Sequence, residues 1–301
     1  MTFLDCLFSA AASLRSNKLR TALTTLGIII GVAAVIAMVG VGKGAEKRID
    51  EAIQGLGENV LFVRNGTSVS GGVRGGSNSK VSLTRADAEA IERQAPAIAI
   101  AAPTVRTTGQ VVFGNSNWFT TVYGVGDAYL RARDWTIGDG RTFNPQEERS
   151  SAKVAIIGET IVEQLLGSQN PIGTIIRLDR IPFRVIGVTH PKGESSWGRD
   201  HDDVVFVPIS TAKSRMNVGE RFRGRFVRDI TVKARSADLL GEAEQQIIEV
   251  LRQRHRIRPG QPDDFYVRNI AQYLEARAKS ERTMSMLLAA VAGISLIVGG
   301  I

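Results

Sequence analysis

Cysteine is almost absent from this sequence, since Cys6 is the single one among 301 residues. No disulfide can form within the chain, so packing alone must hold the fold, even in an oxidising compartment. Leu4 and Asp5 precede Cys6, whereas a lipoprotein cleavage site needs a small residue directly before its cysteine. The sequence therefore argues against a lipid anchor on Cys6.

Patterns that bind metals are also scarce. Three histidines have no close histidine or cysteine neighbour in sequence: His190, His201 and His255. Their isolation disfavours a transition-metal site. Asp200, Asp202 and Asp203 could bind Ca²⁺, but the ligand spacing of a calcium loop is missing, which favours a turn before the next strand. We predict no metal-binding or cofactor-binding residue, and no cofactor.

Motifs of an ATPase or a hydrolase are missing as well. Gly42-Lys43-Gly44 and the glycines between residues 71 and 76 do not have the spacing of the phosphate-binding motif GxxxxGK[ST]. No serine stands in GxSxG, and we expect Cys6 to be a poor nucleophile. We therefore predict no catalytic residue, and that the chain is not an enzyme.

Positive charge is in excess, because 38 lysines and arginines face 30 aspartates and glutamates. Two stretches are rich in arginine, the first with Arg215, Arg221, Arg223, Arg225 and Arg228, the second with Arg252, Arg254, Arg256 and Arg258. These side chains could meet phosphates, but two long uncharged runs elsewhere in the sequence predict a membrane anchor. We therefore favour a solvated face or a protein-contact surface, and we predict no nucleic-acid partner.

The first of two long uncharged runs extends from Thr21 to Gly42, between Arg20 and Lys43. As a helix it would be about 33 Å long, which is enough to cross a hydrocarbon core of about 30 Å. A cleaved signal peptide is the main alternative, because small residues follow the run. However, the run is longer than such peptides need and twenty residues precede it, so we predict a retained transmembrane helix.

The segments around this run extend the membrane interpretation. Phe3 to Leu19 has apolar residues at helical spacing, which predicts a helix lying along the membrane surface. A second uncharged run, Thr283 to Ile301, reaches the last residue, so we expect a second transmembrane helix that is incomplete. Lysines and arginines are balanced on the two sides of the first run, so charge does not set the orientation.

The region between the runs predicts two strand–helix–strand units. Helical stalks, Lys43 to Gly57 and Ala271 to Thr283, connect it to the runs, and Gly57 is the expected helix stop. The first unit comprises a strand at Asn59–Arg64, a helix opened by a capping box of Thr84 and Asp87 and ending near Gln94, and a strand at Thr104–Val112. The second comprises a strand at Arg228–Ala234, a helix at Ala237–His255 and a strand at Phe265–Ile270. Such units can pair into one split α+β sandwich.

Two further segments interrupt these units. Asn65 to Lys80 is a Gly/Ser-rich loop that we expect to be mobile. The larger insertion predicts strands at Val154–Ile157, Ile175–Leu178, Phe183–Val188 and Val204–Val207, a turn at Asp179-Arg180 and a short helix at Thr160–Leu166. The insertion is therefore expected to form a mostly β second subdomain.

Motifs along the whole chain resemble one family in order. They are LRTALTTLGIIIGVAAVIAMVGVGKGAEKRI from Leu19, TVYGV from Thr121, GRTF from Gly140, NPIGTIIRL from Asn170, FRVIGV from Phe183, HDDVVFVPIS from His201 and SMLLAAVAGISLIVGGI from Ser285. The set resembles the MacB-like permeases of macrolide-exporter-type ABC transporters, which are related to FtsX-like proteins. Their ordered succession is far more specific than any single motif.

The resemblance implies a topology and a function. It implies an inner-membrane protein with residues 1–20 cytoplasmic, 21–42 spanning, 43–282 extracytoplasmic and 283–301 an incomplete second span. Residues 43–120 and 226–282 would form the split α+β part, and residues 121–225 the inserted β-rich part. Members of the family act as dimers with four spans per subunit and receive ATP-driven motion from a nucleotide-binding domain, which this chain lacks.

We therefore expect a non-catalytic permease subunit that transmits motion from a separate ABC ATPase for export or efflux. Its expected partners are that ATPase, a second copy of the permease, a periplasmic adaptor protein and membrane lipid. The alternative is a membrane-tethered binding or regulatory module that acts on a periplasmic partner without transport. Unchanged substrate accumulation on deletion, together with altered cell-wall hydrolysis, would favour this alternative.

Overall fold

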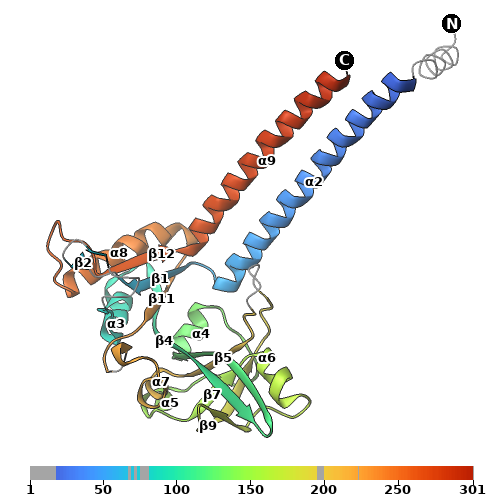
Figure 1. The fold of residues 1–301 in the computed structure, drawn as a ribbon. Coiled ribbons are helices and arrows are strands. Elements are labelled where there is room, and N and C mark those ends of the chain that lie inside the picture. The colour runs from blue at the N-terminus through green and yellow to red at the C-terminus, as the bar shows by residue number, and fades with distance from the viewer. Residues whose placement is uncertain are drawn as a thin grey trace. The chain divides into compact units, whose positions relative to one another are not determined.

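The computed structural model describes residues 18–66, 69–70, 73–74, 81–194, 200–222 and 224–300 (Figure 1). The chain divides into two compact units. One comprises the residues up to Asp50 together with those from Leu274 onward, and the other is Glu51–Tyr273, here called the head. The expected surface helix at Phe3 to Leu19 falls almost entirely outside the described residues.

The first uncharged run lies in α2 (Lys18–Leu56), a single helix of 39 residues. Within the described residues, one helical stretch is long and apolar enough to cross a membrane, Thr21–Ala45, and none of it is buried. Leu23, Ile30 and Ile36 are each at least 60% exposed, which is costly in water but favourable in lipid. The stretch includes all of the predicted span and ends three residues later.

The second run lies in α9 (Ile270–Gly300), which also contains the predicted stalk from Ala271 to Thr283. The side chains of Met286, Leu287 and Ile294 are exposed on this helix. Its assignment as an incomplete second span stays a prediction.

The head is built on one ten-stranded sheet, whose main path runs β12-β1-β11-β4-β5-β10-β7-β9-β6, with β8 pairing with β4 and β9. In the first half the strands are β12 (Phe265–Asn269), β1 (Val60–Asn65), β11 (Asp229–Ala234) and β4 (Ile98–Phe113). In the second half they are β5 (Ser116–Val125), β10 (Val204–Pro208), β7 (Val154–Ile157), β9 (Ile181–Thr189), β6 (Ile137–Gly140) and β8 (Ile175–Leu178). The mixed helix and strand content agrees with the predicted class.

Strand β4 joins the two halves of the sheet. Its first part, up to Thr104, pairs antiparallel with β11, and its second part, from Val105 to Phe113, pairs antiparallel with β5. In this region the sequence predicted a strand only for Thr104 to Val112 and missed both the beginning of β4 and the whole of β5. Because β4 belongs to both halves, the sheet is continuous.

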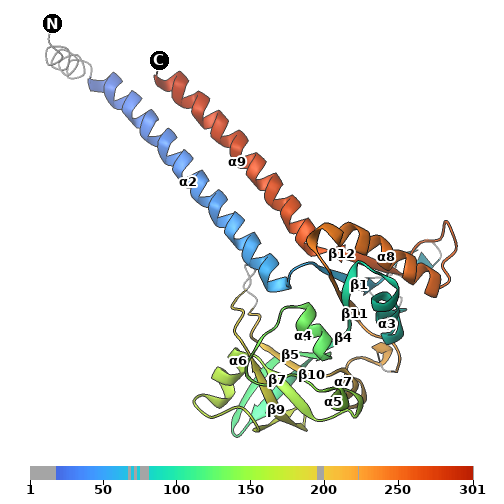
Figure 2. The ribbon, with the colours of Figure 1, turned by 180° about the vertical axis from the view of Figure 1, so that it is seen from behind.

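Helices cover both halves of the sheet (Figure 2). On the first half lie α3 (Arg85–Gln94) and α8 (Leu240–Arg254), which contact each other. Thr84 and Asp87 form the predicted capping box of α3, with the Thr84 side chain accepting from the Asp87 backbone. The predicted helix from Ala237 begins as the 3₁₀ turn Ala237–Leu239 and continues as α8. The remaining helices are α4 (Asp127–Ala132), α5 (Pro145–Arg149), α6 (Glu159–Ile161) and α7 (Ile209–Arg215), with a 3₁₀ turn at Glu220–Phe222.

The strands predicted for the insertion are confirmed as β7, β8, β9 and β10. The turn at Asp179-Arg180 is also confirmed, because both residues have positive φ, +48° and +72°, between paired β8 and β9. The helix predicted at Thr160 to Leu166 is present but is not α-helical throughout. It begins as α6 and continues as a π-helical turn at Val162–Leu166. In the predicted loop from Asn65 to Lys80, the described residues include a small hairpin of β2 (Val69–Ser70) and β3 (Val73–Arg74).

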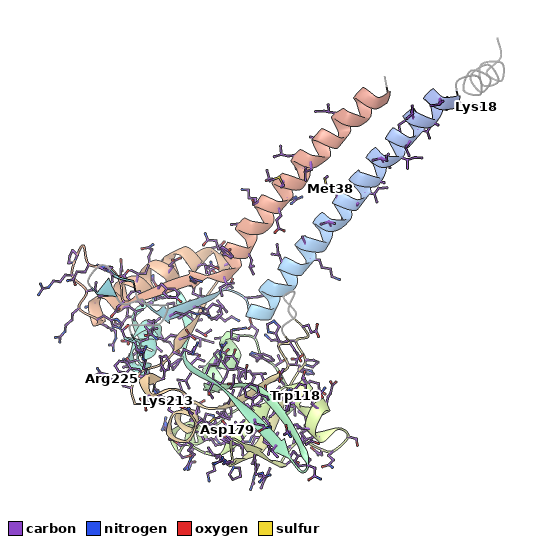
Figure 3. The ribbon with its side chains drawn as sticks, in the orientation of Figure 1. Lys18, Met38, Trp118, Asp179, Lys213 and Arg225 are labelled. Atoms are coloured by element: carbon purple, nitrogen blue, oxygen red, sulfur yellow. The ribbon has the colours of Figure 1, made fainter. Side chains whose placement is uncertain are left out.

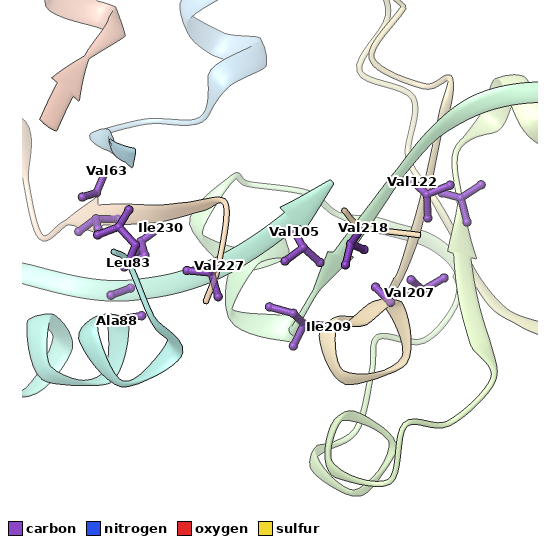
Figure 4. Close-up of a cluster of buried hydrophobic side chains, with 14 of the residues drawn as sticks. Val63, Leu83, Ala88, Val105, Val122, Val207, Ile209, Val218, Val227 and Ile230 are labelled. Carbon is purple, nitrogen blue, oxygen red and sulfur yellow. The ribbon is translucent and has the colours of Figure 1, made fainter. Parts of the chain in front are cut away.

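One hydrophobic core extends through both halves of the head (Figure 4). Around the first half it contains Val63, Leu83, Ala88 and Ile230, and around the second half Val122, Val207, Ile209 and Val218. Val105 and Val227 lie between these groups, and both are fully buried. Each fully buried side chain of this size stabilises the fold by about 1.5–3 kcal/mol. The halves are therefore expected to unfold together.

Candidate functional site at the end of α2

Helix α2 ends inside the head against the backbone of Arg133. Gly57 follows the helix with φ of +90°, a backbone conformation that residues with a side chain rarely adopt. A glycine in this conformation is common directly after a helix. A Cβ at Gly57 would lie 3.1 Å from the Cα and the carbonyl carbon of Arg133. The predicted helix stop is thus confirmed, and the close packing is a second reason for glycine at this position.

The Arg133 side chain binds the last turn of α2. Its Nη2 donates a hydrogen bond of 3.1 Å to the carbonyl oxygen of Gly55, and its guanidinium lies over the Phe62 ring at 5.4 Å. Arg133 follows α4, and its backbone N–H donates to Tyr129, which fixes it to that helix. A cation here also complements the partial negative charge at a helix C-terminus.

Asp134 secures the chain immediately after the helix. One carboxylate oxygen accepts a 3.0 Å hydrogen bond from the backbone N–H of Glu58, and the other pairs with the Lys233 ammonium on β11. Asp134 has φ of +50°, which is uncommon for a residue with a side chain. The pair Arg133-Asp134 therefore attaches the end of α2 to α4 and to the central sheet.

Lys192 and His201 complete this group of residues. The Lys192 ammonium donates to the Arg133 carbonyl oxygen at 2.6 Å and lies 4.7 Å from the centre of the Trp135 ring. Burial, followed by the charge of Arg133, lowers the pKa of Lys192 to about 8. Burial, followed by the charge of Arg133, also lowers the pKa of His201. The His201 ring packs closely on Gly55, since a Cβ added to Gly55 would lie 2.7 Å from Nε2 of His201.

These contacts define what we call the α2 anchor: Gly55, Gly57, Arg133, Asp134, Lys192 and His201. It contains no nucleophile paired with a base, and within the described residues no group of three His, Cys, Asp or Glu could hold a metal ion. What the arrangement can do is mechanical. Arg133 joins the last turn of α2 to α4, and Asp134 joins Glu58, just after the helix, to Lys233 on β11.

The histidines singled out in the sequence lie apart from one another. His201 belongs to the α2 anchor, whereas His255 lies between Asp87 and Asp264 beside α3. His190 is exposed and its backbone N–H donates to Thr136.

The three aspartates lie in and beside the bend that leads into β10, and each binds a different segment. Asp200 accepts from the Thr160 hydroxyl, Asp202 from the backbone N–H groups of Lys192 and Gly193, and Asp203 from the Trp118 indole. Asp202 thereby positions Lys192 in the α2 anchor.

Parts of the two arginine-rich stretches come together, because Arg225 and Arg254 line the same cavity. Arg223 lies outside the described residues. The sequence analysis missed Arg133 and Lys192, because they belong to no motif and their partners lie far away in sequence.

Comparison with known proteins identifies relatives along the whole chain. The family described as MacB-like periplasmic core domain matches residues 21–250. Macrolide export ATP-binding/permease protein MacB of Syntrophobacter fumaroxidans is 38% identical over 99% of the chain and 49% of its own length. The protein of the same name from Chlorobium luteolum is 40% identical over 96% of the chain and 43% of its own length. The chain therefore spans less than half the length of these relatives.

A solved structure supports the same relationship. The periplasmic region of MacB from Actinobacillus actinomycetemcomitans matches with a TM-score of 0.59 at 25% identity. The match covers 77% of this chain and 97% of that one.

Proposed function

Because the chain belongs to the family with a MacB-like periplasmic core domain, we propose that it is the permease component of an ABC-type exporter. In this proposal a separate ATPase drives α2, and α2 moves the head. The chain itself performs no chemistry. Work done on the cytoplasmic side of the membrane would change the arrangement of the strands and helices on the other side.

The observation that carries the proposal is the continuity of α2. One helix of 39 residues contains both the candidate span, Thr21–Ala45, and the turn whose carbonyl is bound by Arg133. The span is about 37 Å long, and the rest of the helix to Leu56 continues for about 16 Å. A helix with no break is a suitable element for passing a displacement along its axis.

The topology belongs to the same proposal. Residues 1–20 would be cytoplasmic, residues 43–282 extracytoplasmic, and residues 283–301 an incomplete second span in the inner membrane. Residues 121–225 would form an inserted β-rich subdomain. Helix α4, which belongs to this subdomain, would connect it to the α2 anchor. The relatives are named as ATP-binding/permease proteins, which supports a functional link to an ATPase. A second permease copy and a periplasmic adaptor are further proposed partners.

Coupling is tested with the full-length protein and its ATPase, purified together and reconstituted in proteoliposomes. Arg133→Gln removes the hydrogen bond from the charged guanidinium to the carbonyl oxygen of Gly55. A hydrogen bond of this type contributes about 1.5–3 kcal/mol. We expect the part of ATP hydrolysis that depends on the permease to fall at least threefold. Arg131→Gln is the matched control, because Arg131 is exposed on α4 and pairs with Asp127 of the same helix.

The two variants have the same net charge and differ by two positions in sequence, so a general charge effect would change both. An ATPase rate that is the same with and without the permease would contradict the proposed coupling. Equal effects of Arg133→Gln and Arg131→Gln on ATP hydrolysis would show that the coupling does not depend on the contact between Arg133 and α2.

A further inference from the structure

A cavity of about 820 Å³ lies in the head, away from the α2 anchor. Its walls come from α3 and α8 on the first half of the sheet and from α7 on the second half. Arg85, Lys213, Arg225 and Arg254 are among the residues that line it. Its volume is typical of sites that bind small molecules.

One short segment holds the basic residues in place. The backbone N–H of Val227 donates to Leu83 at 2.9 Å, and that of Arg85 contacts the Arg225 carbonyl oxygen at 3.4 Å. The Lys213 ammonium donates to the Phe226 carbonyl oxygen at 2.7 Å. Arg85, Lys213 and Arg225 are therefore attached to the same backbone, although they come from three separate parts of the sequence. Figure 3 shows Lys213 and Arg225 on neighbouring segments.

The negative charges that line the cavity already have partners. Asp87 accepts from Arg254 at 2.6 Å, from Thr84 at 2.7 Å and from His255 at 3.4 Å. Although burial opposes ionisation, the hydrogen bonds from His255, Thr84 and Arg254 hold the pKa of Asp87 well below its usual range. The other carboxylate, Glu89, pairs with Arg85 at 3.4 Å.

Two cations remain without a carboxylate. Among the described residues, neither Lys213 nor Arg225 has a carboxylate within ion-pair distance. Arg225 is exposed at the cavity wall, and its guanidinium lies 5.0 Å from the centre of the Phe226 ring. Burial, followed by the charge of Arg85, lowers the pKa of Lys213, as expected for a cation held near another without compensation.

Hydroxyl groups in the cavity wall do not provide competing donors. The Ser82 hydroxyl donates to the Asp264 carbonyl oxygen, that of Ser210 to Glu148, and that of Ser214 to Thr211. Among the side chains that line the cavity, the groups that can donate to a bound molecule are therefore the guanidinium and ammonium groups. Arginine matches the geometry of carboxylates and phosphates, since it can form two parallel hydrogen bonds to either.

We propose that this cavity binds a small anionic ligand, and that Lys213 and Arg225 hold its phosphate or carboxylate groups. The ligand would contact α3 and α7 at once and so connect the two halves of the head. The proposal is independent of the export function, because it concerns the head alone and needs no ATPase.

Binding is measured by isothermal titration calorimetry on the full chain in detergent at about 50 mM salt. The probes are inorganic pyrophosphate and citrate, and glycerol serves as a neutral control. The cavity variant is Lys213→Gln/Arg225→Gln. The matched control is Lys153→Gln/Arg184→Gln, which removes the same charge from exposed positions on the second half of the head.

We expect saturable binding of at least one anion, no binding of glycerol, and at least tenfold weaker binding in the cavity variant. The control should stay within about twofold of the wild type. Binding of pyrophosphate alone would assign phosphate groups to the ligand, and binding of citrate alone would assign carboxylates.

The single variant Arg225→Gln changes an exposed side chain and should weaken binding without affecting the fold, which circular dichroism and a thermal melt would check. Absence of saturable binding by both anions would overturn the proposal. Equal loss in the cavity and control variants would also overturn it, because it would show a general charge effect.

Discussion

Replacing Gly57 tests whether the end of α2 is held tightly against Arg133. Gly57→Ala adds a methyl group at a residue with φ of +90° and places it 3.1 Å from two backbone carbons of Arg133. The backbone conformation alone costs about 1–2 kcal/mol for a residue other than glycine. Because the neighbouring atoms belong to the backbone, they cannot rotate away, and such overpacking adds about 1–3 kcal/mol.

The matched control is Gly114→Ala. Gly114 has φ of +56°, but a Cβ there would have nothing within 4 Å, so only the conformational cost applies. We expect a loss of about 1–2 kcal/mol for Gly114→Ala and about 2–5 kcal/mol for Gly57→Ala. The difference between the variants reports the contact with Arg133.

The assay is urea unfolding of the full chain in detergent, followed by tryptophan fluorescence. Trp118 and Trp135 both lie in the head, and Trp135 is adjacent to Arg133-Asp134, so the signal reports the region of interest. The free energy of unfolding and its dependence on urea are compared between the three proteins. Equal losses for the two variants would refute the close packing of Gly57 on Arg133.

Two further predictions concern the head. Burial opposes protonation of His255, but hydrogen bonds to Asp264 and Asp87 outweigh it and raise the pKa of His255 to about 9. Protonated His255 therefore stabilises the fold fully below about pH 6.5, and this stabilisation is lost as the pH rises through about 9. The lowered pKa of Lys192, about 8, makes the free energy of unfolding rise with pH above about 8, which opposes the effect of His255. We therefore follow the difference in free energy of unfolding between the wild type and His255→Gln, measured by urea unfolding from pH 6 to 10. A difference that stays constant over this range would contradict the prediction. Asp179 has φ of +48° and accepts a 3.0 Å hydrogen bond from Gln110, so Asp179→Ala should cost about 1–2 kcal/mol in the same assay, whereas Asp179→Asn should cost less than about 0.5 kcal/mol. Equal costs for these two substitutions would argue against the turn geometry.

The sequence predicted elements wherever a local signal was strong. The capping box of Thr84 and Asp87, the stop at Gly57 and the turn at Asp179-Arg180 each depend on residues within a few positions of one another. Such signals act through backbone conformation and short-range hydrogen bonds, which do not need the rest of the fold. The strands of the insertion were found for a similar reason, because each contains several apolar, mostly β-branched residues within a few positions.

Features that depend on distant partners were missed. β4 changes its partner from β11 to β5 after Thr104, and nothing local marks that change, because the backbone is extended on both sides. Arg133 and Gly55 are 78 positions apart, and the cavity collects Arg85, Lys213 and Arg225 from three separate segments. Only the packing of the head brings these residues together.

The central claim requires the head to lie on the opposite side of the membrane from the ATPase. Asn115→Cys places a thiol at an exposed turn between β4 and β5, and Cys6→Ser removes the native thiol. A membrane-impermeant maleimide is added to intact spheroplasts and, separately, to permeabilised ones. The account predicts full labelling of Cys6→Ser/Asn115→Cys in the intact spheroplasts. Labelling only after permeabilisation would place the head in the cytoplasm and contradict the proposed transmission through α2.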